Sequence, residues 1–296
     1  MHHGKYRFVF GLLLIPLGLY AVFVVSPYVQ AFPIAFTDWE GLSATYRYIG
    51  FDNFVALFHD SVFWTALRHN LFLLVSLPTI IVTLSLFFSA ALNHRGGIRG
   101  AKFYKIIYFF PAVLSIAVVG VLWQFIFEPR GGLLNGFLRA VGLDALAQPW
   151  LGDGDTALGS IIAVVVWGGV GFYVVLFTAA MAAIPKELYE AALLDGAGSV
   201  QAFFRITLPL IWNTVQVAIA FLVIGALDQF ALIKVLSVGP GGPNDATQVI
   251  SLYMYTNAFA YGKFGYASAI GVTLFALNMI LTVLTFRLTR RERVVY

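Results

Sequence analysis

The 296-residue chain contains no cysteine, so neither disulfide bridges nor thiolate metal sites can form. It is also poor in charge: only 11% of its residues are Asp, Glu, Lys or Arg, against about 25% in soluble domains. Hydrophobic residues make up 60% of the chain, and the mean hydropathy is +0.87. This composition excludes an ordinary soluble globular protein.

Several chemical signatures are missing as well. No Gly-x-x-x-x-Gly-Lys-Ser/Thr segment occurs, so the chain cannot cradle ATP phosphates in a P-loop. The five histidines are scattered, without metal-ligand spacing such as His-Glu-x-x-His. The sequence shows no Ser–His–acid arrangement and no paired carboxylates at membrane depth, so it gives no indication of catalysis. A metal centre is therefore not expected, and a membrane enzyme is the least favoured class.

Long uncharged runs dominate what is present. A membrane-spanning helix needs about 20 apolar residues, and the chain supplies six such runs. Pro16, Pro78 and Pro111 fall inside them and are tolerated because neighbouring helices can satisfy the freed carbonyls. We expect an all-α, polytopic membrane protein that forms one transmembrane domain over residues 1–296. Its spans are expected at about 8–30, 68–93, 104–127, 157–184, 207–236 and 264–287.

The net charge of +4 reflects an asymmetry between loops and gives no reason to expect nucleic acid. With a cytoplasmic N-terminus, the inner segments carry twelve basic residues and the outer segments carry six, as the positive-inside rule requires. Both termini and the loop at residues 185–209 then lie in the cytoplasm. The first apolar run is too long for a signal peptide and lacks a clear cleavage site, so we expect it to be retained.

The loop at residues 185–209 has the pattern of a helical hairpin. Pro185 suits the first turn of a helix, and residues 186–194 are good helix formers. Asp195 and Gly196 interrupt that pattern, and Ser199 is expected to N-cap a second short helix. From these features alone, an ordinary helix–turn–helix connection between two spans is favoured over a docking surface.

The hairpin resembles the coupling loop, or EAA motif, of the membrane subunits of binding-protein-dependent ABC importers. The motif residues are Glu190, Ala191, Ala192, Asp195, Gly196, Ala197, Phe203, Ile206, Leu208 and Pro209. The resemblance implies a six-helix type I importer domain whose first hairpin helix docks in a groove of an ATPase subunit. The acidic residues would pair with basic groups there, and the glycine would permit the sharp turn.

The last third of the chain narrows the resemblance. Residues 227–228, 239–243, 252–255 and 265–269 are similar to the carbohydrate-uptake branch, and more narrowly to the maltose-transporter F-type subunit. The likeness covers nearly the whole chain. Leu227 replaces a frequent Phe, and the large external insertion of some F-type subunits is absent. The implied partners are a different G-type permease, two copies of an ATPase subunit that bind ATP and Mg, and an extracytoplasmic sugar-binding protein.

Candidate substrate contacts come from two sources. Asp228 is the one acid deep enough to cost about 2.5–3.5 kcal/mol if it faced lipid, so we expect it to face the bundle interior or a cavity. A structural role at a helix end explains Asp228 equally well. The resemblance adds Tyr108, Gly168, Gly169, Phe172 and Gln229. Plain helix packing explains the two glycines equally well.

The sequence thus predicts one permease subunit of an ATP-driven sugar importer in the bacterial cell membrane, without a cofactor of its own. An importer of another polar solute, such as a glycerol-phosphate ester, would need cationic groups at mid-span, and none is seen. A secondary transporter would instead need an ion relay and inverted repeats, and no convincing repeat is present.

Overall fold

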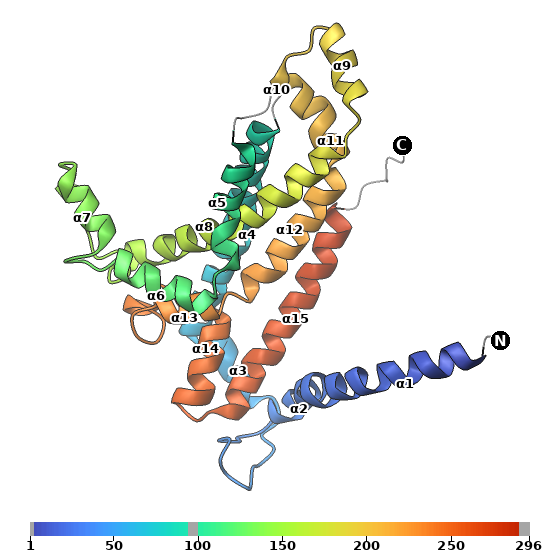
Figure 1. Cartoon of the computed structure of the whole chain (residues 1–296). Helices are drawn as coiled ribbons and strands as arrows, with labels where there is room; N and C mark the ends of the chain where they lie inside the picture. Colours follow the sequence, from blue (N-terminus) through green and yellow to red (C-terminus); the bar gives the residue numbers. More distant parts are fainter. Residues whose placement is uncertain (1–2, 94–99, 290–296) are drawn as a thin grey trace. The chain divides into compact units, whose positions relative to one another are not determined.

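The apolar runs form helices because a backbone in lipid can satisfy its polar groups only within the chain. The structure is a computed structural model that describes residues 3–93 and 100–289 (Figure 1). Its helices are α1 (His3–Tyr20), η1 (Ala21–Val25), α2 (Ser26–Ile34), α3 (Asp52–His59), α4 (Ser61–Leu92), α5 (Ala101–Val113), α6 (Ile116–Ile126), α7 (Leu133–Ala140), η2 (Asp144–Leu146), α8 (Gly154–Ala182), α9 (Lys186–Leu194), α10 (Ser199–Ala202), η3 (Phe203–Thr207), α11 (Leu208–Leu210), α12 (Trp212–Leu227), α13 (Ala231–Leu236), η4 (Pro243–Asp245), α14 (Ile250–Tyr255), η5 (Thr256–Ala260) and α15 (Phe264–Thr289).

The described residues contain four helical segments long and apolar enough to cross a membrane, at Gly11–Ile34, Ser61–Leu92, Gly154–Ala182 and Phe264–Thr285. Two bent pairs raise this number to six if each pair is one span: Ile106–Val113 with Ile116–Ile126, and Ser199–Leu210 with Trp212–Leu227. Apart from one isolated bridge between Thr37 and Tyr48, these residues form no β-structure. The predicted all-α polytopic fold is confirmed.

The third apolar run is not one straight helix. Its two halves, α5 and α6, meet at an angle of 106°. The break lies at Leu114 and Ser115, whose ψ values of 144° and 138° are extended. The sequence predicted one span at about residues 104–127 and carried no signal of this break, because neither residue at the break is a helix breaker by type.

The chain separates into two compact units, residues 1–64 with 253–277, and residues 65–252 with 278–296. In the second unit, α8 supplies the centre of the core: Ile161, Val164 and Val174 are fully buried. The hydroxyls of Ser85 and Ser89 on α4 donate hydrogen bonds to the carbonyls of Val170 and Val174 on α8, at 3.1 and 3.0 Å. These bonds hold α4 against α8 without a large polar side chain.

Gly171 lets α5 approach α8 closely. A Cβ atom at this position would lie 1.6 Å from the backbone carbonyl oxygen of Tyr108. The contact is between backbones, so no side-chain rotation could relieve it. Small residues at such crossings are typical of helix packing in membranes.

In the first unit, Asp60 joins three helices. Its carboxylate accepts backbone N–H groups of Val62 and Phe63 at the start of α4, at 2.8 and 3.3 Å. It also accepts hydrogen bonds from the hydroxyls of Tyr253 on α14 and Tyr266 on α15.

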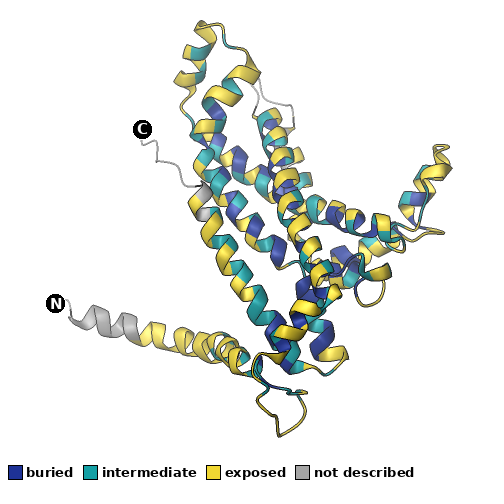
Figure 2. Ribbon diagram, turned by 180° about the vertical axis from the view of Figure 1, so that it is seen from behind, coloured by how far each residue is buried: buried dark blue, intermediate teal, exposed yellow. Residues whose placement is uncertain are grey.

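Helix α1 is exposed over the whole of residues 11–20 (Figure 2).

Gly171→Ala is expected to destabilise the folded chain, by about 1–3 kcal/mol if it behaves as an overpacked core site. Gly159→Ala is the matched control, because it lies on the same helix and its added Cβ atom would meet nothing within 4 Å. Thermal unfolding of both purified variants in detergent measures the difference. Equal melting temperatures would show that α5 and α8 are not in backbone contact.

Candidate functional site

The hairpin at residues 185–209 extends beyond the ends of α8 and α12 in the second unit (Figure 1). Helix α9 ends at Leu194, Asp195 occupies its C-cap position, and Gly196 adopts the left-handed conformation with φ of +77°. The N–H of Ala197 donates to the carbonyl of Ala192 at 2.8 Å, and the N–H of Gly196 to that of Leu193 at 3.0 Å. This bond pair is the Schellman motif, which favours glycine at the left-handed position.

The start of the second hairpin helix differs from the prediction. Ser199 is the first residue of α10, and the capping position belongs to Gly198, which makes no side-chain bond. Gly198 has φ of −72° and ψ of 165°, the extended backbone that a cap requires. The predicted N-cap at Ser199 is therefore wrong by one residue.

The motif residues divide into an exposed set and a packed set. Glu190, Ala191, Asp195 and Gly196 are exposed, and the neighbouring Leu194 is 89% exposed. Phe203 and Leu208 instead pack against a core cluster that includes Phe177 and Met181 of α8. Ala192, Ala197 and Ile206 are half-buried and Pro209 is exposed. One part of the motif thus faces water while another part is fixed to the membrane helices.

A side-chain hydrogen bond links the two arms of the hairpin. The hydroxyls of Tyr189 on α9 and Thr207 on η3 lie 2.8 Å apart. Thr207 is buried and ends a short π-helical turn, after which α11 and α12 follow. The helical segment 199–210 meets α12 at 70°. A displacement of α9 would therefore be carried through Tyr189 and Thr207 towards α12.

A cavity of about 310 Å³ lies among α4, α5, α6, α8, α12 and α13 of the second unit. Of the predicted substrate residues, Gly168, Gly169 and Gln229 line it. A Cβ at Gly168 would meet nothing within 4 Å, whereas the close helix contact falls on Gly171. Gln229 donates its amide to the carbonyl of Gly225 at 3.1 Å.

The other three predicted residues do not line this cavity. Tyr108 packs its ring 4.9 Å from that of Phe88. Phe172 is half-exposed and lies edge-on to Tyr173. Asp228 follows the last residue of α12, where its N–H donates to Gly225, and its side chain is exposed in this chain. The role predicted for Asp228 stays a prediction.

Sequence reasoning missed most of the lining. The lining residues outside the predicted set are Leu77, Ile81, Pro111, Ala112, Leu114, Ile116, Val119, Val164, Val165, Tyr173, Phe221, Leu222, Gly225 and Leu232. Nearly all are apolar, and composition cannot separate an apolar side chain that faces a cavity from one that faces lipid. Only Pro111 carried a usable signal, since the predicted contact Tyr108 was placed just before it.

Comparison with known proteins decides the family. Residues 53–294 match the family described as "Binding-protein-dependent transport system inner membrane component". The chain belongs to this family. It is a multi-pass membrane permease of an ABC importer that works with a binding protein, and it is a transport subunit rather than an enzyme.

Relatives and solved structures agree with this assignment. The chain is 42% identical over 294 residues to the diacetylchitobiose uptake permease NgcF of Streptomyces coelicolor, covering 97% of this chain and 83% of that protein. It is 32% identical to the multiple sugar-binding transport permease MsmF of Streptococcus mutans, covering 95% of each. A subunit of a bacterial alginate ABC transporter superposes with a TM-score of 0.83 at 25% identity, covering 97% and 96%.

Tyr189→Phe is expected to loosen the hairpin, because a typical hydrogen bond contributes about 0.5–1.5 kcal/mol. Thr207→Val should have a similar effect, and the double variant should be less than additive because both changes remove one interaction. Hydrogen exchange of residues 186–210 in the full chain measures the loosening. Strict additivity would show that the two hydroxyls do not interact.

Proposed function

We propose that this chain is one of two different permease subunits of an ATP-driven importer for a di- or oligosaccharide. The observation that carries the proposal is the hairpin, whose exposed face and packed base connect a water-facing surface to the helices around a cavity. A second, G-type permease, two ATPase subunits that bind ATP and Mg, and an extracytoplasmic sugar-binding protein would complete the assembly.

Coupling would proceed through the hairpin. Glu190 and Asp195 present carboxylates beside the exposed Leu194, so an ATPase groove with basic rims and an apolar floor would match this surface. Because Phe203 and Leu208 pack against the core, movement of the hairpin would shift α12 and, with it, one wall of the cavity. Nucleotide and sugar need not touch, since two packing arrangements of the helices can link distant sites.

The cavity supports a neutral substrate. Its described lining has no Lys, Arg, His, Asp or Glu, and offers Gln229 and Tyr173 among apolar side chains. A sugar presents hydroxyls for hydrogen bonds and C–H faces for apolar contact. The sn-glycerol-3-phosphate permease UgpA of Escherichia coli is also 34% identical. A phosphate ester would require a cationic partner, so the cavity favours a sugar over this alternative.

The exposure of the first apolar span supports a second membrane subunit. No residue of the apolar segment Gly11–Ile34 is buried within the chain. Phe23 and Leu14 are 72% and 71% exposed. Lipid and a neighbouring permease would cover this surface. The asymmetry of basic residues supports a topology in which both termini and the hairpin lie in the cytoplasm. The membrane would be the cell membrane of a bacterium.

Gly196→Val is expected to abolish sugar uptake and weaken ATPase association while leaving the chain in the membrane. The φ of +77° is strained for a β-branched residue. Gly198→Val is the control, because Gly198 also has nothing within 4 Å of an added Cβ but has a φ of −72°. Co-purification of the ATPase and uptake of labelled sugar are the measurements. A Glu190→Lys variant is expected to behave like Gly196→Val. Normal uptake by both single variants would contradict the proposed coupling role of the hairpin.

Gly168→Leu is expected to reduce uptake at least tenfold by filling the cavity, while the ATPase remains bound. Gly159→Leu, on the same helix and outside the lining, should transport normally. Uptake and ATPase co-purification separate this effect from a coupling defect. Equal uptake by the two variants would show that the substrate does not pass this cavity.

A further inference from the structure

A second cavity, of about 530 Å³, lies within the first unit. It is formed by residues 37–60 and 253–266. The asymmetry of basic residues predicts that residues 37–60 and 253–263 lie outside the cell, and Tyr266 lies in the first turn of the helix that follows. The volume of the cavity is within the roughly 300–1,000 Å³ typical of small-molecule sites. Trp39, Tyr253 and Tyr266 contribute aromatic surface, while Asn53 and Asn257 contribute amides.

The walls of this outer cavity are held in place by hydrogen bonds. Asp60 fixes the hydroxyls of Tyr253 and Tyr266, the latter at 2.6 Å. Burial raises the pKa of Asp60, but the two tyrosine bonds and the N–H groups of Val62 and Phe63 outweigh it, so the pKa is lowered overall. The carboxylate therefore stays ionised at neutral pH and keeps both rings in position.

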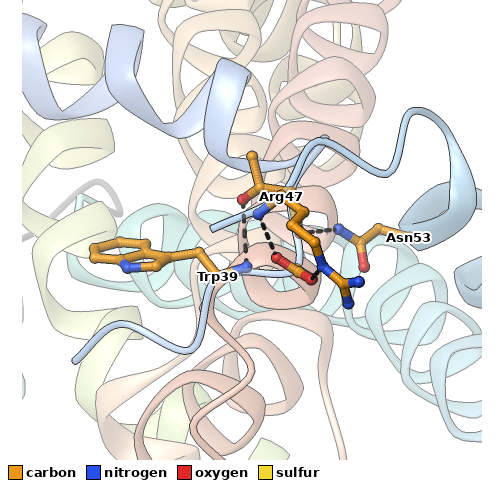
Figure 3. A network of polar contacts seen from close by, with 5 residues as sticks. Trp39, Arg47 and Asn53 are labelled. Atoms are coloured by element: carbon orange, nitrogen blue, oxygen red, sulfur yellow. Dashed lines mark hydrogen bonds and ion pairs between the residues drawn. The ribbon is translucent and has the colours of Figure 1, made fainter. Parts of the chain in front are cut away.

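The part of the lining that comes from residues 37–53 is fixed by a second network (Figure 3). The amide of Asn53 donates to the carbonyls of Ala35 and Thr37, at 2.9 and 2.8 Å. Asp38 accepts the backbone N–H and the guanidinium of Arg47, at 2.7 and 2.9 Å. These bonds hold the pKa of Asp38 below its usual value. The ion pair neutralises one of the carboxylates in the wall.

Two asparagine acceptors remain available to a ligand in this cavity. Asn53 is 9% exposed and Asn257 is 2% exposed, and both line the cavity. Their amide nitrogens are used, in Asn257 by a 2.9 Å bond to the carbonyl of Tyr253. No hydrogen bond from the described residues is recorded to either side-chain oxygen, and neither oxygen is among the fully buried atoms that lack a partner. Both oxygens are therefore open to solvent and can accept from a ligand that carries hydroxyl or N–H groups.

We propose that the outer cavity binds a neutral mono- or disaccharide unit. Aromatic rings match the C–H faces of a sugar, and the two asparagine oxygens match its donors. An anion is disfavoured because Glu40 and Asp60 also line the cavity, and Lys263 disfavours a cation. The inference rests on the proposed sugar-importer function and on the proposed orientation. It adds a holding site for sugar released by the binding protein. This site is separate from the 310 Å³ cavity of the second unit, which we call the central cavity.

Ala56→Trp tests the site by filling it. Ala56 lies on α3, is exposed and lines the cavity, so a larger side chain can enter without breaking a hydrogen bond. Val55→Trp is the matched control: this neighbour is 55% exposed and lies outside the lining. Should Ala56→Trp fail to reach the membrane, Ala56→Leu and Val55→Leu replace the pair.

The measurement is saturation-transfer NMR on the full-length chain with its bound subunits in lipid nanodiscs, without the binding protein. The probes are N,N′-diacetylchitobiose, maltose and raffinose. All three chains carry Gly168→Leu as well, which fills the 310 Å³ cavity of the second unit, so that the remaining signal reports the outer cavity. In this background we expect at least one probe to bind the parent and the Val55→Trp chain equally, and to bind the Ala56→Trp chain at least tenfold more weakly.

Three results would overturn the site. The first is binding by none of the probes to the parent, and the second is equal binding by Ala56→Trp and Val55→Trp. The third is an unchanged sugar signal with weakened docking of the binding protein to Ala56→Trp, which would make the cavity a protein-docking surface. If wild type still imports sugar in any of these cases, only the outer site is lost. Failure of the proposed function would appear separately, in the hairpin variants.

Discussion

The structure depends on the requirement that a backbone in hydrocarbon satisfy its own polar groups. Straight helices meet it with no help, so each departure from a straight helix needs local compensation. The departures in the second unit lie beside the features assigned to transport. The break at Leu114 and Ser115 borders the central cavity, and the bend near Ile211 joins the hairpin to α12.

The hairpin shows how one short motif can meet two opposed demands. Docking needs exposed side chains, whereas transmission of force needs buried ones. The Schellman turn at Gly196 separates the exposed residues of α9 from Phe203 and Leu208, which are packed on the core. Because the turn is closed by backbone bonds, its shape requires glycine at position 196 but no particular side chain at the exposed residues around it.

The sequence predicted those parts of the molecule whose cause is local. The helical character of the apolar runs, the extent of α9 and its interruption at Asp195 and Gly196 follow from residue type and spacing, and the structure confirms them. The left-handed conformation of Gly196 is added by the structure. The break in α5–α6 was not predicted, because neither Leu114 nor Ser115 is a helix breaker by residue type. The cavity lining was largely missed for a similar reason: Ile81 and Phe221 are ordinary apolar helix residues until their neighbours are known. Ser199 failed as a cap because the preceding glycine already had the required backbone.

The two serine bonds between α4 and α8 also constrain the path of the chain. Their partners advance together, from Ser85 and Val170 to Ser89 and Val174, so the two helices run in the same direction. The beginnings of α4 and α8 must then emerge at one side of the bilayer. The chain between them, which contains the bent pair α5–α6, must then cross the bilayer an odd number of times. A pair of hydroxyls thus sets the parity of the crossings independently of any count of charges.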